Sequence, residues 1–521
     1  MARDVVIVGS GINALSAAAL LGKRGKRVLV LERNAEIGGC IRTEEITAPG
    51  FVHDVMATTF VLFLVGPAYA ALRSDLERHG LSFSHTEHPT AVVRPDGSSA
   101  VLTMDRETNM AMFRALAEGD EKGFEAGTAE VAGNADIVFS LLGQGLWTRA
   151  TATLLARQAW KRGPRSLAAF FGEALAPARG WLENGFSSET SRALFAPWVL
   201  HTGLNPDSTY SGMMAKVIAF SLEAAGAPIV TGGAKNLLAA FRALIEEQGG
   251  EIRTGADVAR INVSGGRARS VTLEGGETIR ASHVVASVTP TQLYGRLLER
   301  PSERTAQAAR AYRYGKGNFQ LHYALDAPAR WKAPGLEKVA LTHLTPGLDG
   351  VAKASAEAER GVLPDRPTIC VGQPTALDPS RAPEGKAILW MQMPETPRLI
   401  EGDARGEIAP PEDGRWTEAI REAYADRIEA ILAEHVDGFR QTIIARRAYS
   451  PADLEAMNMN LVGGDPYGGH CAIDQFFLWR PFKGSVNHRT EVQNLWHIGA
   501  STHPGPGLGG GSGYLVSREI R

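Results

Sequence analysis

Near the start of the chain, small residues recur at a spacing suited to binding a phosphate: Gly9, Gly11 and Ala14. An apolar run precedes them and an Ala/Leu-rich stretch follows, which predicts a strand, a tight turn and a helix. Glycine at the second position lets the backbone approach a pyrophosphate, and the helix N-terminus offers N–H groups and positive potential. Glu32 ends the next apolar run, where a carboxylate can accept hydrogen bonds from a ribose. This pattern predicts a dinucleotide site, and a βαβ unit without a ligand is the alternative.

A second glycine pair, Gly38-Gly39, follows the second predicted strand and is followed by Arg42. The pair permits another close backbone approach, and the guanidinium of Arg42 can lie beside a diphosphate. For Arg42 the alternative is a surface ion pair. The extended pattern resembles the FAD-binding motif of the amine oxidase and phytoene desaturase superfamily rather than an NAD site. It therefore implies FAD as the cofactor.

Hydrophobic periodicity predicts the elements that must position these residues. We expect strands at 5–8 and 28–31 around a helix at 14–21, then a helix at 237–248, a strand at 251–261 and a β-meander ending at 285. The spacing predicts further helices at 109–117, 137–142, 150–161, 166–175, 188–195 and 417–436. In the last of these, one face carries Ile420, Tyr424, Ile428, Ile431 and Leu432. The tail reads as a strand, a glycine-rich loop and a short helix.

Composition narrows the class of protein. The chain has 521 residues, with 55 basic and 57 acidic side chains, a balance that argues against nucleic-acid binding. Its 57 glycines and 44% hydrophobic residues suit a large α/β enzyme. The three cysteines are far apart in sequence, which disfavours a redox disulfide, a zinc ribbon and a secreted disulfide scaffold. We see no signal peptide and no apolar run long enough to span a membrane, so we expect a cytoplasmic protein.

Residues 160–165 combine a tryptophan with basic side chains among apolar neighbours. This pattern is compatible with a helix lying on a membrane surface, which would make the protein peripheral to the membrane. An ordinary core helix with a solvated basic edge is at least as good an interpretation.

Several blocks together resemble the phytoene-dehydrogenase-like branch of the FAD-dependent amine oxidase superfamily, which includes carotenoid desaturases, carotenoid isomerases and retinol saturases. The blocks are residues 9–43, 49–54, 200–206, 463–481 and 499–511. The resemblance implies an α/β fold with a discontinuous Rossmann-type FAD-binding domain, which carries the β-meander, and an α+β substrate domain. We expect the FAD domain in residues 1–60, 228–295 and 485–521, and the substrate domain in 61–227 and 296–484.

The resemblance also implies the FAD-binding residues. They are Gly9, Gly11, Ala14, Glu32, Arg33, Gly38, Gly39, Arg42, Val258, Gly499, Ala500, Gly507, Leu508 and Gly509. The backbone of Val258 should meet the adenine, and the tail glycines should approach the diphosphate, ribityl chain and flavin. The chain departs from the family at Gly505-Pro506-Gly507 and Gly510-Gly511-Ser512, where other members more often have Gly-Gly-Gly and Gly-Ala-Pro. This departure changes the backbone beside the flavin ring, so the substrate can differ from the family's best-known ones.

A flavin takes a hydride, so the protein must position a C–H bond and exclude water. Four polar residues close to the expected flavin are candidates for catalysis: His503, Asp54, Arg480 and Tyr467. Asp54 or His503 could transfer a proton, and Arg480 could polarise a substrate oxygen or pair with Asp474. His53, Asp474 and Gln475 complete the candidate set. A structural hydrogen-bonding role is the alternative for every one of them.

Other cofactors have little support in the sequence. His79, His85 and His88 lie close together, but no metal-binding frame surrounds them, so we expect no metal. We also find no second strand–glycine–helix unit for a tightly held NAD(P)H. Electrons should therefore leave to oxygen, a quinone or another carrier.

Three functional hypotheses remain open. The first is an FAD-dependent desaturase or dehydrogenase, with saturase or isomerase as near variants, that acts on an apolar or conjugated substrate. The second is a flavin amine or amino-acid oxidase, which needs an aromatic cage; the tail offers only Trp496 and Tyr514. The third is a non-catalytic FAD protein that acts through a partner. Under the first hypothesis, residues 57–72 and the helices between 137 and 182 should line or gate an apolar cavity, although they could simply pack a core.

Overall fold

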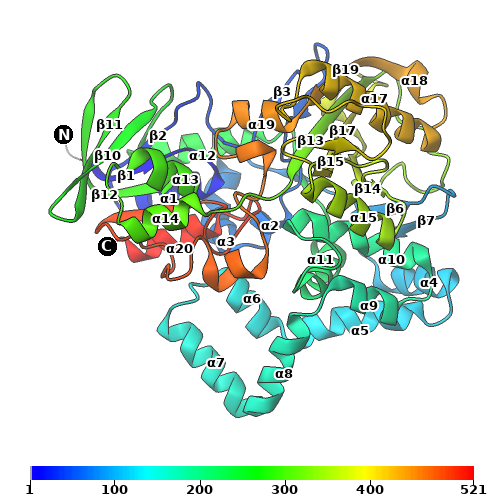
Figure 1. Ribbon diagram of the computed structural model, residues 1–521, viewed down its shortest axis with the longest axis horizontal. Coiled ribbons are helices and arrows are strands. Elements are labelled where there is room, and N and C mark those ends of the chain that lie inside the picture. Colours follow the sequence, from blue (N-terminus) through cyan, green and yellow to red (C-terminus); the bar gives the residue numbers. More distant parts are fainter. Residues whose placement is uncertain (1–2) are drawn as a thin grey trace.

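The first of two large sheets is built around the predicted nucleotide-binding strands. The computed structural model describes residues 3–521, and each large sheet has seven strands (Figure 1). The order is β10-β11-β12-β1-β2-β9, with β20 also pairing with β12. The strands are β1 (Arg3–Val8), β2 (Val28–Leu31), β9 (Glu251–Arg253), β10 (Val258–Ser264), β11 (Arg267–Leu273), β12 (Thr278–Ser287) and β20 (Leu495–Ile498). Strands β1, β2, β9, β12 and β20 pair in parallel, and β10–β12 form the antiparallel meander.

Both faces of this sheet are covered, as its continuous apolar strands require. Val5 and Ile7 pack toward one set of helices, whereas Val6 and Val8 pack toward the meander on the other face. The helices on the first face are α1 (Ile12–Gly22), α3 (Pro67–Arg78), α12 (Lys235–Glu247) and α20 (Gly511–Glu519). The second face is covered by α13 (Pro290–Gln292), η2 (Leu293–Leu297) and α14 (Glu303–Arg310).

The second sheet is mainly antiparallel and has the order β19-β13-β17-β16-β14-β6-β7. Its strands are β6 (Thr90–Val93), β7 (Ser99–Leu102), β13 (Gly317–Leu325), β14 (Leu341–Leu344), β16 (Ile369–Gly372), β17 (Ala387–Thr396) and β19 (Ile443–Tyr449). One face packs on α17 (Glu418–His435). Ile420, Tyr424, Ile428, Ile431 and Leu432 are all buried there, which confirms the predicted apolar face of this helix.

Helices cover the other face of the second sheet and extend beyond it. They are α4 (Arg106–Leu116), α5 (Asp120–Gly133), α6 (Ala135–Gly143), α7 (Arg149–Arg162), α8 (Pro164–Ala174), α9 (Ala178–Gly185), α10 (Glu189–Phe195), η1 (Ala196–Thr202) and α11 (Ser211–Ala225). Figure 1 shows α6, α7 and α8 projecting away from both sheets, and we call residues 135–174 the arm. Within residues 3–521, no helix combines the length and the apolar character needed to cross a bilayer.

The remaining elements are short connectors and two-stranded pairs. They are α2 (Val61–Leu64), β3 (Thr43–Glu44), β4 (His53–Asp54), β5 (Phe83–Ser84), β8 (Ile229–Val230), α15 (Leu348–Glu359), β15 (Val362–Leu363), α16 (Pro374–Leu377), η3 (Pro379–Arg381), β18 (Gly402–Asp403), α18 (Phe439–Thr442), α19 (Pro451–Met457), η4 (Val462–Gly464), η5 (Ile473–Gln475) and η6 (Phe477–Trp479).

One predicted strand is wrong in detail. The stretch 251–261 forms two strands, because β9 pairs with β2 whereas β10 turns away to pair with β11. Every strand of the first sheet falls within residues 1–60, 228–295 and 485–521. We therefore propose these stretches as the cofactor lobe, and 61–227 with 296–484 as the substrate lobe.

Candidate functional site

The turn between β1 and α1 has the geometry that a bound diphosphate requires. Gly9 has a φ of +89°, and a Cβ there would lie 2.9 Å from the carbonyl oxygen of Ser287, so only glycine fits. Gly11 precedes α1, and no side chain caps the helix. A Cβ on Gly11 would meet nothing within 4 Å, so the uncapped N-terminus faces open space. This cradle fits the diphosphate of FAD, and Ala14, fully buried behind it, lets α1 pack closely on the sheet.

Glu32 is held in place at the carboxyl end of β2. Its side chain is buried and accepts hydrogen bonds from the backbone N–H and the hydroxyl of Ser10, at 3.1 and 2.6 Å, and from the N–H of Asn34 at 2.9 Å. A carboxylate has about four acceptor sites. Glu32 therefore retains capacity to accept a bond from a ribose hydroxyl.

The adenine side of the site is formed by the segment before β10. The N–H of Ala256 donates to the carbonyl of Glu32 at 2.8 Å, which brings Val258 near the end of β2. Arg33 lies 3.7 Å from Asp257 in an ion pair across the same edge. These contacts place Arg33 and Val258 beside the predicted nucleotide.

The second glycine pair packs directly against the first turn. Gly38 donates its N–H to the hydroxyl of Ser10 at 3.0 Å, and a Cβ on Gly39 would lie 3.4 Å from the Cα of Gly11. Arg42 pairs with Glu44 and lines two cavities of about 380 and 210 Å³. Gly39 lines the smaller one, and Arg447 adds a second guanidinium to the larger. Arg42 thus makes the surface ion pair and also lies beside the predicted diphosphate.

The tail returns to the start of α1. The N–H of Gly499 donates to the hydroxyl of Ser512 at 3.0 Å, and that hydroxyl donates to the side-chain oxygen of Asn13 at 2.8 Å. Gly513 passes so close to α1 that a Cβ would lie 1.9 Å from the carbonyl oxygen of Asn13. Two helix N-termini therefore meet beside the glycine loop, and Ala500 follows directly. We expect this junction to hold the flavin end of the cofactor.

Residues 57–72 lie against the same loop. A Cβ on Gly507 would lie 2.5 Å from a methyl group of Leu62, and one on Gly509 would lie 3.4 Å from the Leu62 carbonyl oxygen. Leu508 packs on the core beneath the first sheet. The apolar segment predicted to line the substrate path thus touches the predicted flavin segment.

His503 is buried and neutral. Its Nε2 lies 2.9 Å from the carbonyl oxygen of Gln144 in the arm, so this nitrogen carries the proton and donates it. Burial, together with the charges of His488 and Arg480, lowers the pKa of His503 to about 3. Its Nδ1 is buried with no hydrogen-bond partner among residues 3–521. At neutral pH, His503 can therefore accept a hydrogen bond at Nδ1 but cannot act as an acid.

Asp54 lies in a structural setting. It forms an ion pair with Arg381 at 2.9 Å, and neither side chain has any exposed surface. Its other oxygen accepts from the Thr43 hydroxyl at 2.6 Å and from the Ala234 N–H at 2.9 Å. Since these contacts occupy both oxygens, we assign Asp54 to the framework rather than to proton transfer. His53 is equally buried, and its Nε2 bonds the hydroxyl of Thr47 at 2.7 Å.

Two further candidates are used elsewhere in the fold. The predicted pairing of Asp474 with Arg480 is wrong: Asp474 is half exposed and pairs with Arg313 at 2.7 Å, because η5 presents it to solvent. Gln475 accepts from the N–H of Arg313 and donates to its carbonyl. Both residues therefore fix the loop around Arg313.

Arg480 and Tyr467 join two loops at the predicted flavin end. Arg480 donates to the carbonyl oxygens of Ala500 and Tyr467, at 2.9 and 2.5 Å. The hydroxyl of Tyr467 donates to the carbonyl oxygen of Leu200 at 2.5 Å. Arg480 thus ties the predicted substrate side directly to the tail segment.

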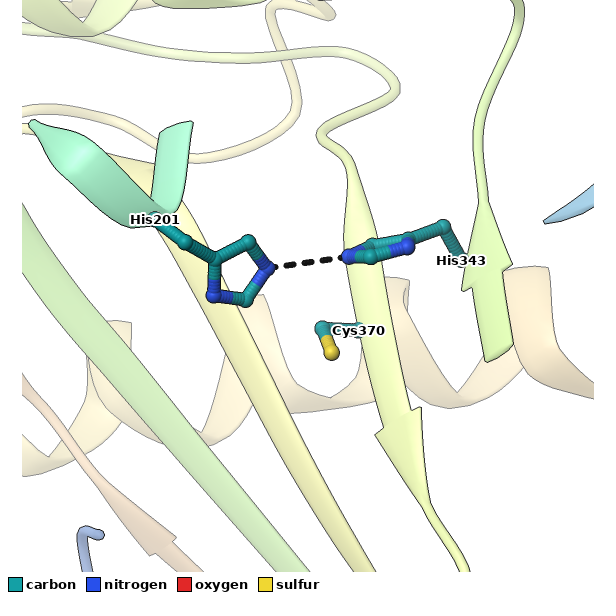
Figure 2. A group of neighbouring side chains, drawn as sticks. All are labelled: His201, His343 and Cys370. Carbon is teal, nitrogen blue, oxygen red and sulfur yellow. Dashed lines mark hydrogen bonds between the residues drawn. The ribbon is translucent and has the colours of Figure 1, made fainter. Parts of the chain in front are cut away.

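The sheet of the substrate lobe adds polar side chains that the sequence analysis missed (Figure 2). His201 on η1 and His343 on β14 face one another with 3.0 Å between their Nε2 atoms, and Cys370 lies beside them on β16. Burial lowers the pKa of His201 to about 4 and that of His343 well below its usual value. The pair is therefore a hydrogen bond between neutral rings. A polar residue inside an otherwise apolar strand was the available signal for His343 and Cys370.

Comparisons with known proteins agree with this site. The family described as flavin containing amine oxidoreductase matches residues 15–424. The chain is 27% identical to the rat pyridine nucleotide-disulfide oxidoreductase domain-containing protein 2, over 99% of this chain and 94% of that protein. It is 25% identical to a limonene dehydrogenase chain of Castellaniella defragrans, with 99% and 94% covered. It is 28% identical to the zeta-carotene-forming phytoene desaturase of Myxococcus xanthus, with 97% and 91% covered.

Solved structures share the fold at lower identity. An oxidoreductase from Methanosarcina mazei superposes with a TM-score of 0.61 at 16% identity, covering 99% of this chain and 100% of that one. The cyclohexylamine oxidase of Brevibacterium oxydans gives 0.58 at 16% identity, covering 100% and 99%. The family match spans most of the chain and the glycine cradle fits FAD, which confirms the predicted α/β fold and cofactor. The chain belongs to the flavin-containing amine oxidoreductase family and is an FAD-dependent oxidoreductase of its phytoene-desaturase-like branch.

Proposed function

We propose that this enzyme is a desaturase or dehydrogenase that removes a hydride from an apolar substrate, with saturation or isomerisation as close variants. The observation that carries the proposal is an apolar contact between the arm and the predicted flavin end. The arm's core includes Ile137, Leu141, Phe170, Phe477 and Leu478, and the ring of Phe477 lies 5.8 Å from that of His503. Apolar side chains therefore continue from the arm to the tail.

We also propose that the arm contacts a membrane. Trp160 near the end of α7 is 92% exposed, and Lys161 and Arg165 beside it are exposed as well. A tryptophan surrounded by basic residues suits the lipid headgroup region, because the ring enters the boundary while the charges meet anionic lipids. The projecting position of α7 and α8 would let this tip reach a bilayer (Figure 1). A water-insoluble substrate could then enter without crossing water.

The protein's own groups determine what the site can do. FAD supplies the hydride acceptor when bound. The cradle at Gly9–Gly11 and the Ser512–Asn13 contact would hold and orient that cofactor, and the arm would exclude water. His503, neutral and buried, can accept a hydrogen bond but does not supply a proton. The electrons would leave to oxygen, a quinone or another carrier.

The relatives support an apolar substrate over an amine. Their names include a phytoene desaturase and a limonene dehydrogenase, which are both named for hydrocarbons. An amine oxidase would need an aromatic cage, but Trp496 is 9% exposed and packs in the core of the first sheet. Tyr514 packs against the same core and accepts a hydrogen bond from Arg518.

Anaerobic bleaching of the flavin absorbance tests this proposal. The loaded enzyme is mixed with an alkene set (limonene, phytoene, octadecene and oleate) in liposomes, and separately with putrescine and cyclohexylamine. We expect bleaching by at least one alkene and none by the amines. Bleaching by the amines alone would favour the amine oxidase. A flavin that no substrate or electron donor can reduce would favour the non-catalytic alternative.

A further inference from the structure

The guanidinium of Arg480 is a buried cation that is only partly satisfied. The side chain is 3% exposed, its Nε and Nη2 donate to the carbonyls of Ala500 and Tyr467, and its Nη1 has no hydrogen-bond partner among residues 3–521. Both acceptors are neutral carbonyl oxygens. A buried charge without an ionic partner is costly, so this arrangement calls for a further group.

No carboxylate of the described chain supplies that partner within 4.0 Å. Asp465 is the nearby acid, but its oxygens accept backbone N–H groups from Gly315, Tyr467 and Gly469, at 2.7, 2.8 and 2.9 Å. Burial also raises the pKa of Asp465, which weakens it as a counter-ion. The thiol of Cys471 lies beside the guanidinium and is only a weak acceptor.

The wall next to Arg480 contains a second unsatisfied group. The guanidinium lies 5.1 Å from the centre of the Phe476 ring, and Tyr210 stacks on the same ring at 5.7 Å. Tyr210 is 8% exposed, and its hydroxyl has no partner within residues 3–521. Its φ of +67° is unfavourable for a tyrosine, so the surrounding fold holds it in place. Two polar groups thus lie in an otherwise apolar wall formed by Leu204, Phe476 and neighbouring side chains.

We propose that Arg480 binds a carboxylate at one end of an otherwise apolar substrate, with the Tyr210 hydroxyl as a second donor. Arg480 is fixed to Ala500, so a bound carboxylate would be anchored beside the predicted flavin segment while the chain lies toward the arm. A planar guanidinium held by two carbonyls presents its remaining N–H groups in a fixed direction, which suits a carboxylate. The substrate class would then be long-chain unsaturated acids rather than pure hydrocarbons. This inference rests on the proposed function.

Binding of three C18 ligands with different ends tests the inference. The FAD-loaded enzyme is titrated with oleate, oleyl alcohol and octadecene below their aggregation concentrations, and the perturbation of the flavin spectrum gives each affinity. Hydrogen bonds to a charged group predict that oleate binds about tenfold to a hundredfold more tightly than octadecene. In Arg480→Met this preference should disappear, and Tyr210→Phe should reduce it.

Matched variants separate recognition from folding. Arg480→Lys keeps the charge but loses the fork, so it should retain part of the preference; it replaces Arg480→Met if that variant does not fold. Arg310→Met removes an exposed arginine that pairs with Glu303 at 2.8 Å and should bind all three ligands as the wild type does. If Arg480 only fastens the two loops, Arg480→Met will lower the thermal midpoint and leave the oleate preference intact.

The outcomes that overturn the inference differ from those that overturn the proposed function. Equal affinities for the three ligands in the wild type, or no spectral change with oleate, would exclude the carboxylate site. An unchanged preference in Arg480→Met would exclude Arg480 as its anchor. Neither result depends on flavin bleaching, which tests the proposed function, and bleaching by hydrocarbons alone would leave that function standing without this inference.

Discussion

Asp54 and Arg381 form a fully buried ion pair that joins the cofactor lobe to the substrate lobe. Their side chains meet at 2.9 Å with no exposed surface on either. Arg381 also donates to the carbonyl oxygens of Val52 and Val230, at 3.0 and 3.4 Å. The pair therefore connects η3 with the strand that carries Asp54 and with β8.

Breaking this pair should destabilise the protein strongly. Arg381→Met leaves the Asp54 carboxylate buried without its partner, and we expect a loss of about 3 to 5 kcal/mol in the free energy of unfolding. Urea denaturation measures the loss. The double variant Arg381→Met/Asp54→Asn should recover part of it, and Arg310→Met at an exposed pair should change little. A loss of only about 0.5 kcal/mol in Arg381→Met would show that the pair contributes like a surface one.

The purified protein should be yellow and should release FAD, not FMN, on denaturation. The reason is that Glu32 and the Gly9–Ala14 turn are placed for an adenosine diphosphate, which FMN lacks. Chromatography of the released flavin measures this. Colourless protein that fails to take up added FAD would contradict the site.

Gly11→Val should abolish flavin retention while leaving the fold intact. The backbone at Gly11 has a φ of −64°, which valine accepts, and a Cβ meets no protein atom within 4 Å. Valine would therefore fill space meant for the diphosphate rather than clash with the chain. The ratio of flavin to protein and the circular dichroism spectrum measure the two effects. Gly180→Val, at another open glycine, is the control and should keep its flavin. Full flavin content in a folded Gly11→Val would show that the site lies elsewhere.

Glu395 should make stability fall as pH rises. This residue is fully buried and accepts the N–H of Thr368 at 2.6 Å. Burial raises its pKa from 4.5 to about 8 in the folded state. The folded protein then holds a proton that the unfolded chain has released, so the contribution is present below pH 4.5 and is lost between about pH 4.5 and 8, at about 1.4 kcal/mol per pH unit.

Glu395→Gln removes this titration and tests it directly. The variant's unfolding free energy should depend less steeply on pH than that of the wild type between pH 5 and 8, with a difference of a few kcal/mol across the range. Glu337→Gln, at an exposed position, should follow the wild-type curve. Parallel curves for wild type and Glu395→Gln would mean that Glu395 titrates normally.

Trp160 and Lys161 should govern binding to membranes. Trp160→Ala/Lys161→Glu removes the exposed ring and reverses a charge at the tip of the arm, and we expect recovery with anionic liposomes in flotation to fall severalfold. Leu399→Ala removes an exposed apolar side chain elsewhere, 51% accessible, and should not change recovery. If the double variant floats as well as the wild type, the arm is not the membrane contact.

The amino-acid sequence by itself determined the parts of the protein whose physics is local. The turn at Gly9–Gly11, the strand that ends before Glu32 and the apolar face of α17 depend on spacing and periodicity within one segment, and the structure places all three as predicted. FAD followed from the same local pattern, because a glycine turn at a helix N-terminus needs no distant residue to suit a diphosphate.

Only the tertiary structure decided which polar residues meet. The Asp54–Arg381 pair, the His201–His343 contact and the bonds from Arg480 to Ala500 join segments that sequence spacing cannot pair. Asp54 thereby proved to be part of the framework, and Asp474 proved to be on the surface beside Arg313. The physical reason is that a charged side chain is reactive or structural according to its partners and burial. Both depend on contacts between distant parts of the chain that exist only after folding.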